Sequence, residues 1–226
     1  MFTLEFPARL AHCLRTWYGE KGRRPVLVKQ LQERDRRRMR KHFLALDNSD
    51  RLLRFGSIVH DEQVLAYVER IDFSRDAVYG VYNGVFRLVA VGHLAFAPKE
   101  KLPAGSASTT KDRIAEFGIS VAASARGLGI GSKMFERAAI HCRNSDVDTL
   151  YMHCLSSNQT MMHIAKKAGM EIQRERGEAD AYLRLLPANP ASMMQEAIEE
   201  QVATIYYTLK SNTRYALKFF GAGGKT

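Results

Sequence analysis

Cysteine is scarce in this chain, and the few cysteines are placed in a way that argues against stabilising cross-links. Cys13, Cys142 and Cys154 are odd in number and show no paired spacing. We therefore expect neither a disulfide framework nor a structural zinc site, and we assign no metal site.

Long apolar runs are missing as well. No stretch approaches the roughly 18–20 apolar residues that a membrane-spanning helix needs. Near the N-terminus Arg9, His12 and Arg15 interrupt every apolar run, so we expect no signal peptide. These absences and the unpaired cysteines predict a cytoplasmic protein without a membrane partner.

Apolar residues are nevertheless plentiful, and positive charge is concentrated in one segment. The chain has 226 residues, of which 46% are hydrophobic, so it can bury the core of one large domain or of one domain with an appendage. Of the net charge of +10, residues 21–54 contribute +8, with twelve Lys/Arg against four Asp/Glu. Such a block indicates an anionic partner, namely nucleic acid, an anionic metabolite or cofactor phosphates. A solvated basic helix face would explain it equally well.

Apolar spacing predicts helices first, then a β-meander, then alternating helices and strands. Asn83-Gly84 between two β-rich runs signals a hairpin, and the DNSD sequence at 47–50 ends one helix and can cap the segment after it. A Pro/Gly/Ser/Thr loop is expected at 99–110. In order, the expected elements are a strand at 25–31, helices at 32–46 and 59–71, strands at 77–82, 85–96 and 114–121, a helix at 130–142, a strand at 149–155, a helix at 159–168, and strands at 171–176 and 181–186.

A further helix is expected after residue 189. Asn189 can serve as its N-cap, with Pro190 at the first helical position. One face of this helix is apolar: Met194, Ala197, Ile198, Val202, Ile205 and Leu209. The stripe must be covered by the protein's own domain or by a second copy, so a homodimer through this helix is one expectation. The end of the chain, from 221 to 226, is expected to be loose.

The turn at 126–132 is the feature with the clearest chemistry. Gly127, Gly129 and Gly131 let backbone N–H groups converge without obstruction by Cβ atoms. A helix that begins directly after them points its unpaired N–H groups and the positive end of its dipole into the turn. Arg126 adds a fixed positive charge at the rim. These features predict a site for phosphate oxygens, whereas a plain tight turn would bind nothing.

Two familiar phosphate-binding motifs fit this turn poorly. A Walker A loop places lysine directly after its last glycine, but Ser132 follows Gly131 here. A dinucleotide fingerprint needs glycine at 132 and an acidic residue at the end of the next strand, which instead reads Leu155-Ser156-Ser157. A pyrophosphate turn of the Arg/Gln-x-x-Gly-x-Gly/Ala type fits without adjustment.

With Glu116 ten residues before this turn, Asn158 after the next strand and Lys167-Ala168-Gly169-Met170 closing the second helix, the chain resembles the GNAT acetyltransferase superfamily. The match covers residues 85–186 well and the N-terminal part in outline. It implies an α/β (α+β) fold with a mixed, mostly antiparallel sheet of six to seven strands flanked by helices. The sheet would be splayed between the two parallel strands that hold the cofactor. The GNAT domain would span 1–188, with a basic helical segment at 21–72 on the acceptor side, and a C-terminal helical extension with a tail would span 189–226.

The resemblance also implies acetyl-CoA as the acetyl donor and assigns its binding residues. The backbone of Ile119, Ser120 and Val121 would pair with the pantetheine arm, and Asn158 would hydrogen-bond the pantetheine or the acceptor. The turn would hold the pyrophosphate through Arg126, Gly127, Leu128, Gly129, Ile130, Gly131 and Ser132.

The resemblance also indicates candidate catalytic residues. In the family's pattern the N–H of Val121 polarises the thioester carbonyl. Glu116 matches a position that some members use as the general base, although it could instead pair with Arg113 or Lys111. His153 lies where some relatives carry a catalytic glutamate, and a histidine titrates in the useful range, although a strand histidine is often structural.

Two further residues bear on the proton path. His93, on the preceding hairpin, is a third candidate base. The family often places a tyrosine acid seven residues after the asparagine, where this chain has Ala165. The acid would then be water or another group, or the protein would be a non-catalytic acetyl-CoA sensor.

The acceptor is predicted only as a class, a small-molecule or protein amine. A wall of positive charge on the acceptor side would disfavour polyamines and suit an anionic acceptor. A nucleic-acid-binding protein that uses residues 21–54 is a third hypothesis, although no aromatic stacking residues accompany the arginines.

Overall fold

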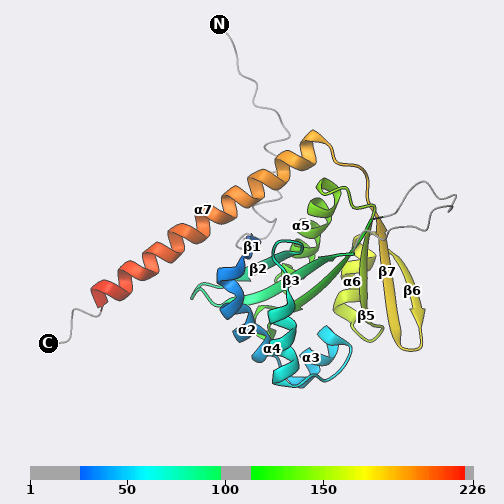
Figure 1. Cartoon of the computed structure of the whole chain (residues 1–226), viewed down its shortest axis with the longest axis horizontal. Helices are drawn as coiled ribbons and strands as arrows, with labels where there is room; N and C mark the ends of the chain where they lie inside the picture. Colours follow the sequence, from blue (N-terminus) through cyan, green and yellow to red (C-terminus); the bar gives the residue numbers. More distant parts are fainter. Residues whose placement is uncertain (1–25, 98–112, 222–226) are drawn as a thin grey trace, which may run out of the picture.

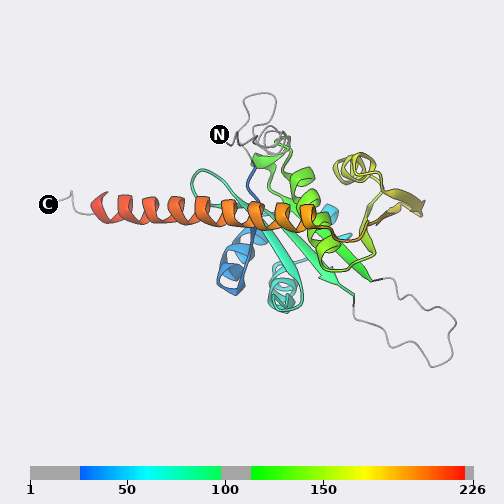
Figure 2. The same ribbon diagram turned by 90° about the horizontal axis from the view of Figure 1, so that it is seen from above.

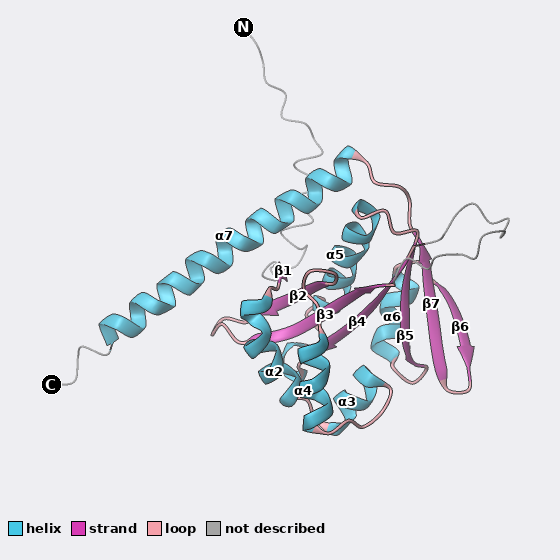
Figure 3. Ribbon diagram, in the orientation of Figure 1, coloured by secondary structure: helices cyan, strands magenta, loops and turns pink. Residues whose placement is uncertain are grey.

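The protein is built on one seven-stranded sheet, described by a computed structural model for residues 26–97 and 113–221, with side chains up to residue 212 (Figures 1 and 3). The strand order is β1-β2-β3-β4-β5-β7-β6, and all neighbours are antiparallel except β4 and β5. This confirms the mixed, mostly antiparallel sheet of six to seven strands. The strands are β1 (Lys29–Gln30), β2 (Ala77–Tyr82), β3 (Leu88–Phe96), β4 (Ile114–Val121), β5 (Thr149–Leu155), β6 (Glu171–Glu175) and β7 (Glu178–Arg184).

Helices cover both faces of the sheet (Figure 2). The helices α2, α3 and α4 lie on one side, and α5 and α6 lie on the other, so two apolar cores form. Side chains of β4 alternate between them, because Phe117 enters the α5 core while Gly118 and Ser120 face α2 and α3. The helices are α2 (Arg36–Leu44), α3 (Asn48–Phe55), α4 (Asp61–Arg70), α5 (Ile130–Asn144), α6 (Gln159–Lys167) and α7 (Pro190–Gly221), with short 3-10 turns at Glu33–Asp35 and Ala123–Ala125.

Helix α3 is the main element that the apolar pattern did not predict. Asp47 caps it, because its side chain accepts a hydrogen bond from the N–H of Asp50 at 2.8 Å, as the DNSD signal suggested. Gly56 ends it in the left-handed conformation, with φ of 74°. The helix packs against β4 and β5, so it covers the place where these two strands meet.

Several strand limits differ from the predictions. β3 begins at Leu88 rather than 85, because the Asn83 side chain accepts hydrogen bonds from the N–H groups of Val85 and Arg87 and closes a longer loop. β7 begins at Glu178 rather than 181, since Arg176 and Gly177 both have positive φ and form a two-residue turn. The first strand is limited to Lys29–Gln30.

The parallel strands β4 and β5 separate before β4 ends. Their pairing runs from Ile114–Thr149 to Glu116–Tyr151 and stops there, so the second half of β4 pairs only with β3. The N–H of Ala122 bonds to Val89 on the β3 side. Because backbone groups alternate between the two edges of a strand, the N–H and C=O groups of Ile119 and Val121 face the open side. The expected splay between the two parallel strands is therefore present.

Helix α7 begins as predicted and packs on α5 through charged groups. The Asn189 side chain accepts a hydrogen bond from the N–H of Ser192 at 2.8 Å. On its inner face, Glu196 contacts Nδ1 of His141 at 2.6 Å and Nη1 of the buried Arg137 at 3.0 Å. Other residues of the helix expose large apolar side chains: Met193, Met194, Ile198, Ile205, Tyr206 and Leu209.

The helix is long, about 48 Å at 1.5 Å per residue, and its C-terminal part projects away from the sheet (Figures 1 and 2). Within the described ranges, no helix is both long and apolar enough to cross a bilayer. The division at residue 188 and the homodimer through α7 stay predictions. The loop expected at 99–110, the tail after residue 221, residues 21–25 of the basic block and Cys13 lie outside the described residues.

Candidate active site

A groove of about 470 Å³ opens where β4 and β5 separate, between α3, the N-terminal end of α5 and one side of α6. It brings together every residue predicted to bind the cofactor except Leu128, which is 53% exposed. Those assignments stay predictions. The lining residues include Ile119, Ser120, Val121, Arg126, Gly127, Gly129, Ile130, Gly131, Ser132 and Asn158.

The glycines of the turn serve two different purposes. Gly127 and Gly129 have φ of 72° and 77°, and no atom lies within 4 Å of the place where a Cβ would stand, so an approaching anion finds open space. The first backbone bond of α5 runs from the N–H of Lys133 to Gly129, which leaves the N–H groups before it free for a ligand. Gly131 instead permits close packing, because its Cβ would lie 2.9 Å from Cδ1 of Ile164 in α6.

Arg126 has a partner that the sequence did not indicate. Its guanidinium forms an ion pair with Asp50 of α3, and its Nε donates to the carbonyl of Val121 at 3.3 Å. Lys167 also lines the groove, and among the described residues it has no ion-pair partner. The sequence marked Lys167 only as part of the helix ending, yet it brings a positive charge to the groove that the glycine turn also lines.

Asn158 is held by two contacts of its own. Its side-chain oxygen accepts from the N–H of Met161 at 3.1 Å and caps α6, while Nδ2 lies 3.5 Å from the carbonyl of Leu53 in α3. The residue is 8% exposed. Asn158 therefore connects α6 to α3 at the wall of the groove, whichever ligand it also contacts.

Ser120 faces a buried histidine. Nε2 of His42 lies 3.0 Å from the Ser120 hydroxyl, and Nδ1 lies 3.3 Å from the carbonyl of Leu88. Burial lowers the pKa of His42 to about 4, so the ring is neutral near pH 7. Because the Leu88 carbonyl can only accept, Nδ1 carries the proton and the Ser120 hydroxyl donates to Nε2. No sequence signal marked this pair, which links residues 78 positions apart.

Glu116 is exposed, on the same face of β4 as Gly118 and Ser120. The alternative that it pairs with Arg113 is excluded, because the Arg113 guanidinium bonds to the carbonyls of Ser145 and Asp146. Lys111 lies outside the described residues. No other described residue binds the Glu116 carboxylate, so it is available to a ligand.

His93 and His153 are both already engaged. His93 contacts the Tyr67 hydroxyl at 3.0 Å through Nδ1 and Asp76 at 2.8 Å through Nε2, and burial lowers its pKa. His153 contacts Asp180 of β7 at 2.8 Å, and the Tyr151 hydroxyl donates to the same carboxylate oxygen at 2.6 Å. Neither histidine lines the groove, and the base role of His153 stays a prediction.

The position expected for the acid is closed to the site. Ala165 is 1% exposed and belongs to the core beneath α6. A side chain there faces the α5 core rather than the groove, so no acid from this position is available.

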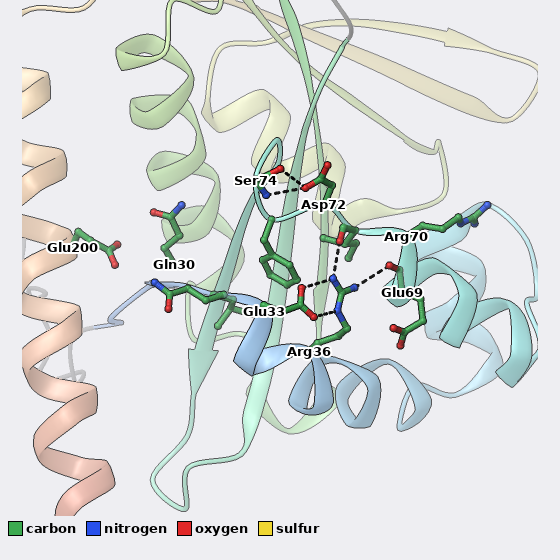
Figure 4. Close-up of a pocket in the computed structure, with 12 residues that line it drawn as sticks. Gln30, Glu33, Arg36, Glu69, Arg70, Asp72, Ser74 and Glu200 are labelled. Atoms are coloured by element: carbon green, nitrogen blue, oxygen red, sulfur yellow. Dashed lines mark hydrogen bonds and ion pairs between the residues drawn. The ribbon is translucent and has the colours of Figure 1, made fainter.

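In the described part of the basic segment, residues 26–54, five of the nine basic side chains form ion pairs. Arg36 lines a hollow of about 760 Å³ away from the groove, where it pairs with Glu33 and donates to the carbonyls of Val68, Glu69 and Ile71 at the end of α4 (Figure 4). Three more arginines are ion-paired: Arg38 with Asp35, Arg40 with Glu69, and Arg51 with Asp61. These contacts stabilise the helical layer. They give no support to a wall of free charge or to a nucleic-acid surface.

Comparisons with known proteins agree with this fold. The family model described as Acetyltransferase (GNAT) family matches residues 11–170. The GNAT domain of S. lividans PAT is similar, with a TM-score of 0.55 and 19% identity over 70% of this chain and 89% of that one. An N-acetyltransferase from Staphylococcus aureus Mu50 gives a TM-score of 0.53 and 15% identity over 71% and 99%. Spermidine N-acetyltransferase from Vibrio cholerae, in complex with CoA and spermine, gives 0.50 and 16% over 70% and 92%.

Proposed function

Because this chain belongs to the GNAT acetyltransferase family, we propose that it moves the acetyl group of acetyl-CoA directly to the nitrogen of an amine acceptor. The gap between β4 and β5 carries this proposal. Strand pairing stops after Glu116 and Tyr151, and the free edge of β4 leads directly to the glycine turn. A thioester arm that pairs with this edge would have its phosphates at the turn and its acetyl end beside the acceptor face.

The residues present fit such a donor. Gly127 and Gly129 leave open space at the turn, and the first N–H groups of α5 have no helical partner. Arg126 and Lys167 would contribute positive charge to the phosphates, and Ile119 and Val121 would offer backbone groups to the pantetheine amides.

The donor, the backbone and one side chain near the gap would each have a separate role in the transfer. Bound acetyl-CoA would supply the acetyl group as a thioester. The N–H of Val121 would donate to the acyl oxygen as negative charge develops there. Glu116 would take the proton of the amine, directly or through water. The sulfur would take its proton from water, since Ala165 supplies none.

Acetyl-CoA binding and amine-dependent thiol release together test the proposal. Titration calorimetry should show binding, and a thiol-release assay should show turnover with part of an amine panel. The panel includes spermine, because the V. cholerae neighbour holds it. Gly129→Ala should weaken binding roughly tenfold, because its Cβ enters the phosphate space. Gly177→Ala carries similar backbone strain in the β6–β7 turn and should leave binding unchanged. Failure to bind acetyl-CoA would contradict the proposal.

A non-catalytic acetyl-CoA sensor is the second candidate, and Ala165 is the observation that favours it. This function predicts the same binding without thiol release on any amine. The calorimetric and turnover measurements therefore separate the two functions on one sample.

A further inference from the structure

Among the arginines of residues 26–54 that are buried or half-buried, Arg54 differs from the others because it has no acidic partner. Arg36, Arg38, Arg40 and Arg51 each contact a carboxylate, whereas Arg54 forms no ion pair within the described residues. Its Nε is buried and has no hydrogen-bond partner there either. A half-buried guanidinium without a counter-ion is costly, so it favours an anionic ligand.

The guanidinium of Arg54 lies flat on β4 beside the groove. A Cβ on Gly118 would stand 2.8 Å from the Cζ and Nη2 atoms of Arg54, so only glycine allows the side chain to rest there. Arg54 also lines the groove together with Ser120 and Val121. Its charge is therefore at the acceptor side of the gap, where the acetyl end of the donor is proposed to lie.

Aromatic and polar neighbours hold the side chain in this place. Cζ of Arg54 lies 5.2 Å from the ring centre of Phe55 and 5.3 Å from that of Tyr67. Nη2 donates to the Tyr67 hydroxyl at 2.7 Å, and this hydroxyl in turn contacts His93, which is bound to Asp76. The chain of contacts reaches a carboxylate only through two intervening side chains, so it orients the guanidinium without neutralising it.

Glu116 and Arg54 flank the same short stretch of strand. Glu116 and Gly118 point to one face, and their Cα atoms are roughly 6.5 Å apart along β4. The candidate base and the guanidinium over Gly118 can therefore contact two neighbouring groups of one small molecule. An amino group would face Glu116, and an anion attached close to it would face Arg54.

We propose that Arg54 binds a carboxylate of the acceptor, so that the acceptor is a small amine with a carboxylate near its amino group, as in a free amino acid. The planar guanidinium suits a carboxylate because it offers paired N–H donors. This inference rests on the proposed acetyl transfer, which requires the amino group of the acceptor to face Glu116. The reason for expecting an anionic acceptor is then the single residue Arg54 rather than the summed charge of residues 21–54.

Matched acceptor pairs test the proposal through binding as well as turnover. Free amino acids and their carboxamides are titrated into the protein–CoA complex, and thiol release from acetyl-CoA is measured with the same compounds. A responsive amino acid should bind roughly tenfold to hundredfold more tightly than its amide. Arg54→Met should remove this difference, and Arg54→Lys should keep only part of it. Arg37→Met, an exposed arginine of α2, is the control and should change nothing.

The outcomes distinguish this inference from the proposed function. Equal binding of carboxylates and amides, binding of neither, preference for spermine, or selectivity that survives Arg54→Met would each overturn the acceptor assignment. Carboxylate-selective binding that depends on Arg54 but gives no thiol release would uphold it and would contradict acetyl transfer. Acetyl-CoA affinity and thermal unfolding of each variant show whether the groove itself is intact.

Discussion

Arg126 of the glycine turn and Asp50 of α3 form an ion pair, although 76 positions separate them in the chain. Asp50 and Arg54 are four residues apart and therefore lie on one face of α3. One helix thus contacts the glycine turn through Asp50 and the surface of β4 at Gly118 through Arg54. Because α3 lines the groove, a change in the ion pair between Arg126 and Asp50 acts directly on the groove wall.

Asp50→Asn should strengthen acetyl-CoA binding. The carboxylate competes with phosphate for Arg126 and adds negative charge beside the turn, so its removal should lower Kd roughly threefold to tenfold. Titration calorimetry measures the effect, with Glu62→Gln on α4 as a control for the loss of one exposed negative charge. Arg126→Met should weaken binding more in the Asp50→Asn background than in the native one. Weaker binding by Asp50→Asn would show that the ion pair shapes the site rather than competing with the ligand.

Glu116→Gln should lower kcat roughly a hundredfold to ten-thousandfold, because the amine loses its proton acceptor. The Kd for acetyl-CoA should not change, since Glu116 does not line the groove. His153→Gln, one strand away and engaged with Asp180, should stay within about threefold of the native rate. The opposite result for the two variants would assign the base role to His153.

The stability of the protein should fall in mild acid because of His42. Its folded pKa is about 4, below the usual value of 6.5, so the unfolded chain takes up a proton first as the pH falls. The contribution of neutral His42 to the free energy of unfolding is fully present above pH 6.5 and is lost between pH 6.5 and pH 4. At pH 5 the loss is about 2 kcal/mol.

Urea unfolding of the native protein and His42→Gln at pH 7.5 and 5 measures this contribution. The native protein should lose about 2 kcal/mol more than the variant over this interval. His93 titrates in both proteins, so it cancels in the comparison. Equal losses would mean that His42 is already protonated, or solvated, in the folded state.

Glu196→Gln should weaken the attachment of α7. The substitution leaves the buried guanidinium of Arg137 with only Glu200, and it removes the acceptor of His141. We expect a loss of roughly 1–3 kcal/mol in urea unfolding. Glu199→Gln is a matched control on the same helix. It breaks a more exposed pair with Lys133 and should cost less than about 1 kcal/mol.

The features that could be predicted from the sequence are those whose cause is local. Alternating glycines followed by a helix start form an anion site wherever they occur, and the caps at Asp47 and Asn189 need only the next three residues. The strand limits were predicted wrongly where the conformation or contacts of a single residue decided them. Asn83 lengthened the loop before β3 by binding two N–H groups, and the positive φ of Arg176 shortened the turn before β7.

Tertiary structure decided the partners of the charged and titratable groups. Composition placed most of the positive charge at 21–54, but only the packing of α2, α3 and α4 showed which arginines are neutralised within their own layer and that Arg54 is not. The same packing buried His42 against Ser120 and brought Asp50 to Arg126. Sequence alone predicted the glycine turn and the order of the elements other than α3, since both depend on neighbouring residues. The proposed acceptor side depends on contacts between segments that are far apart in the sequence. Their positions in space are fixed only when the chain folds around its two cores.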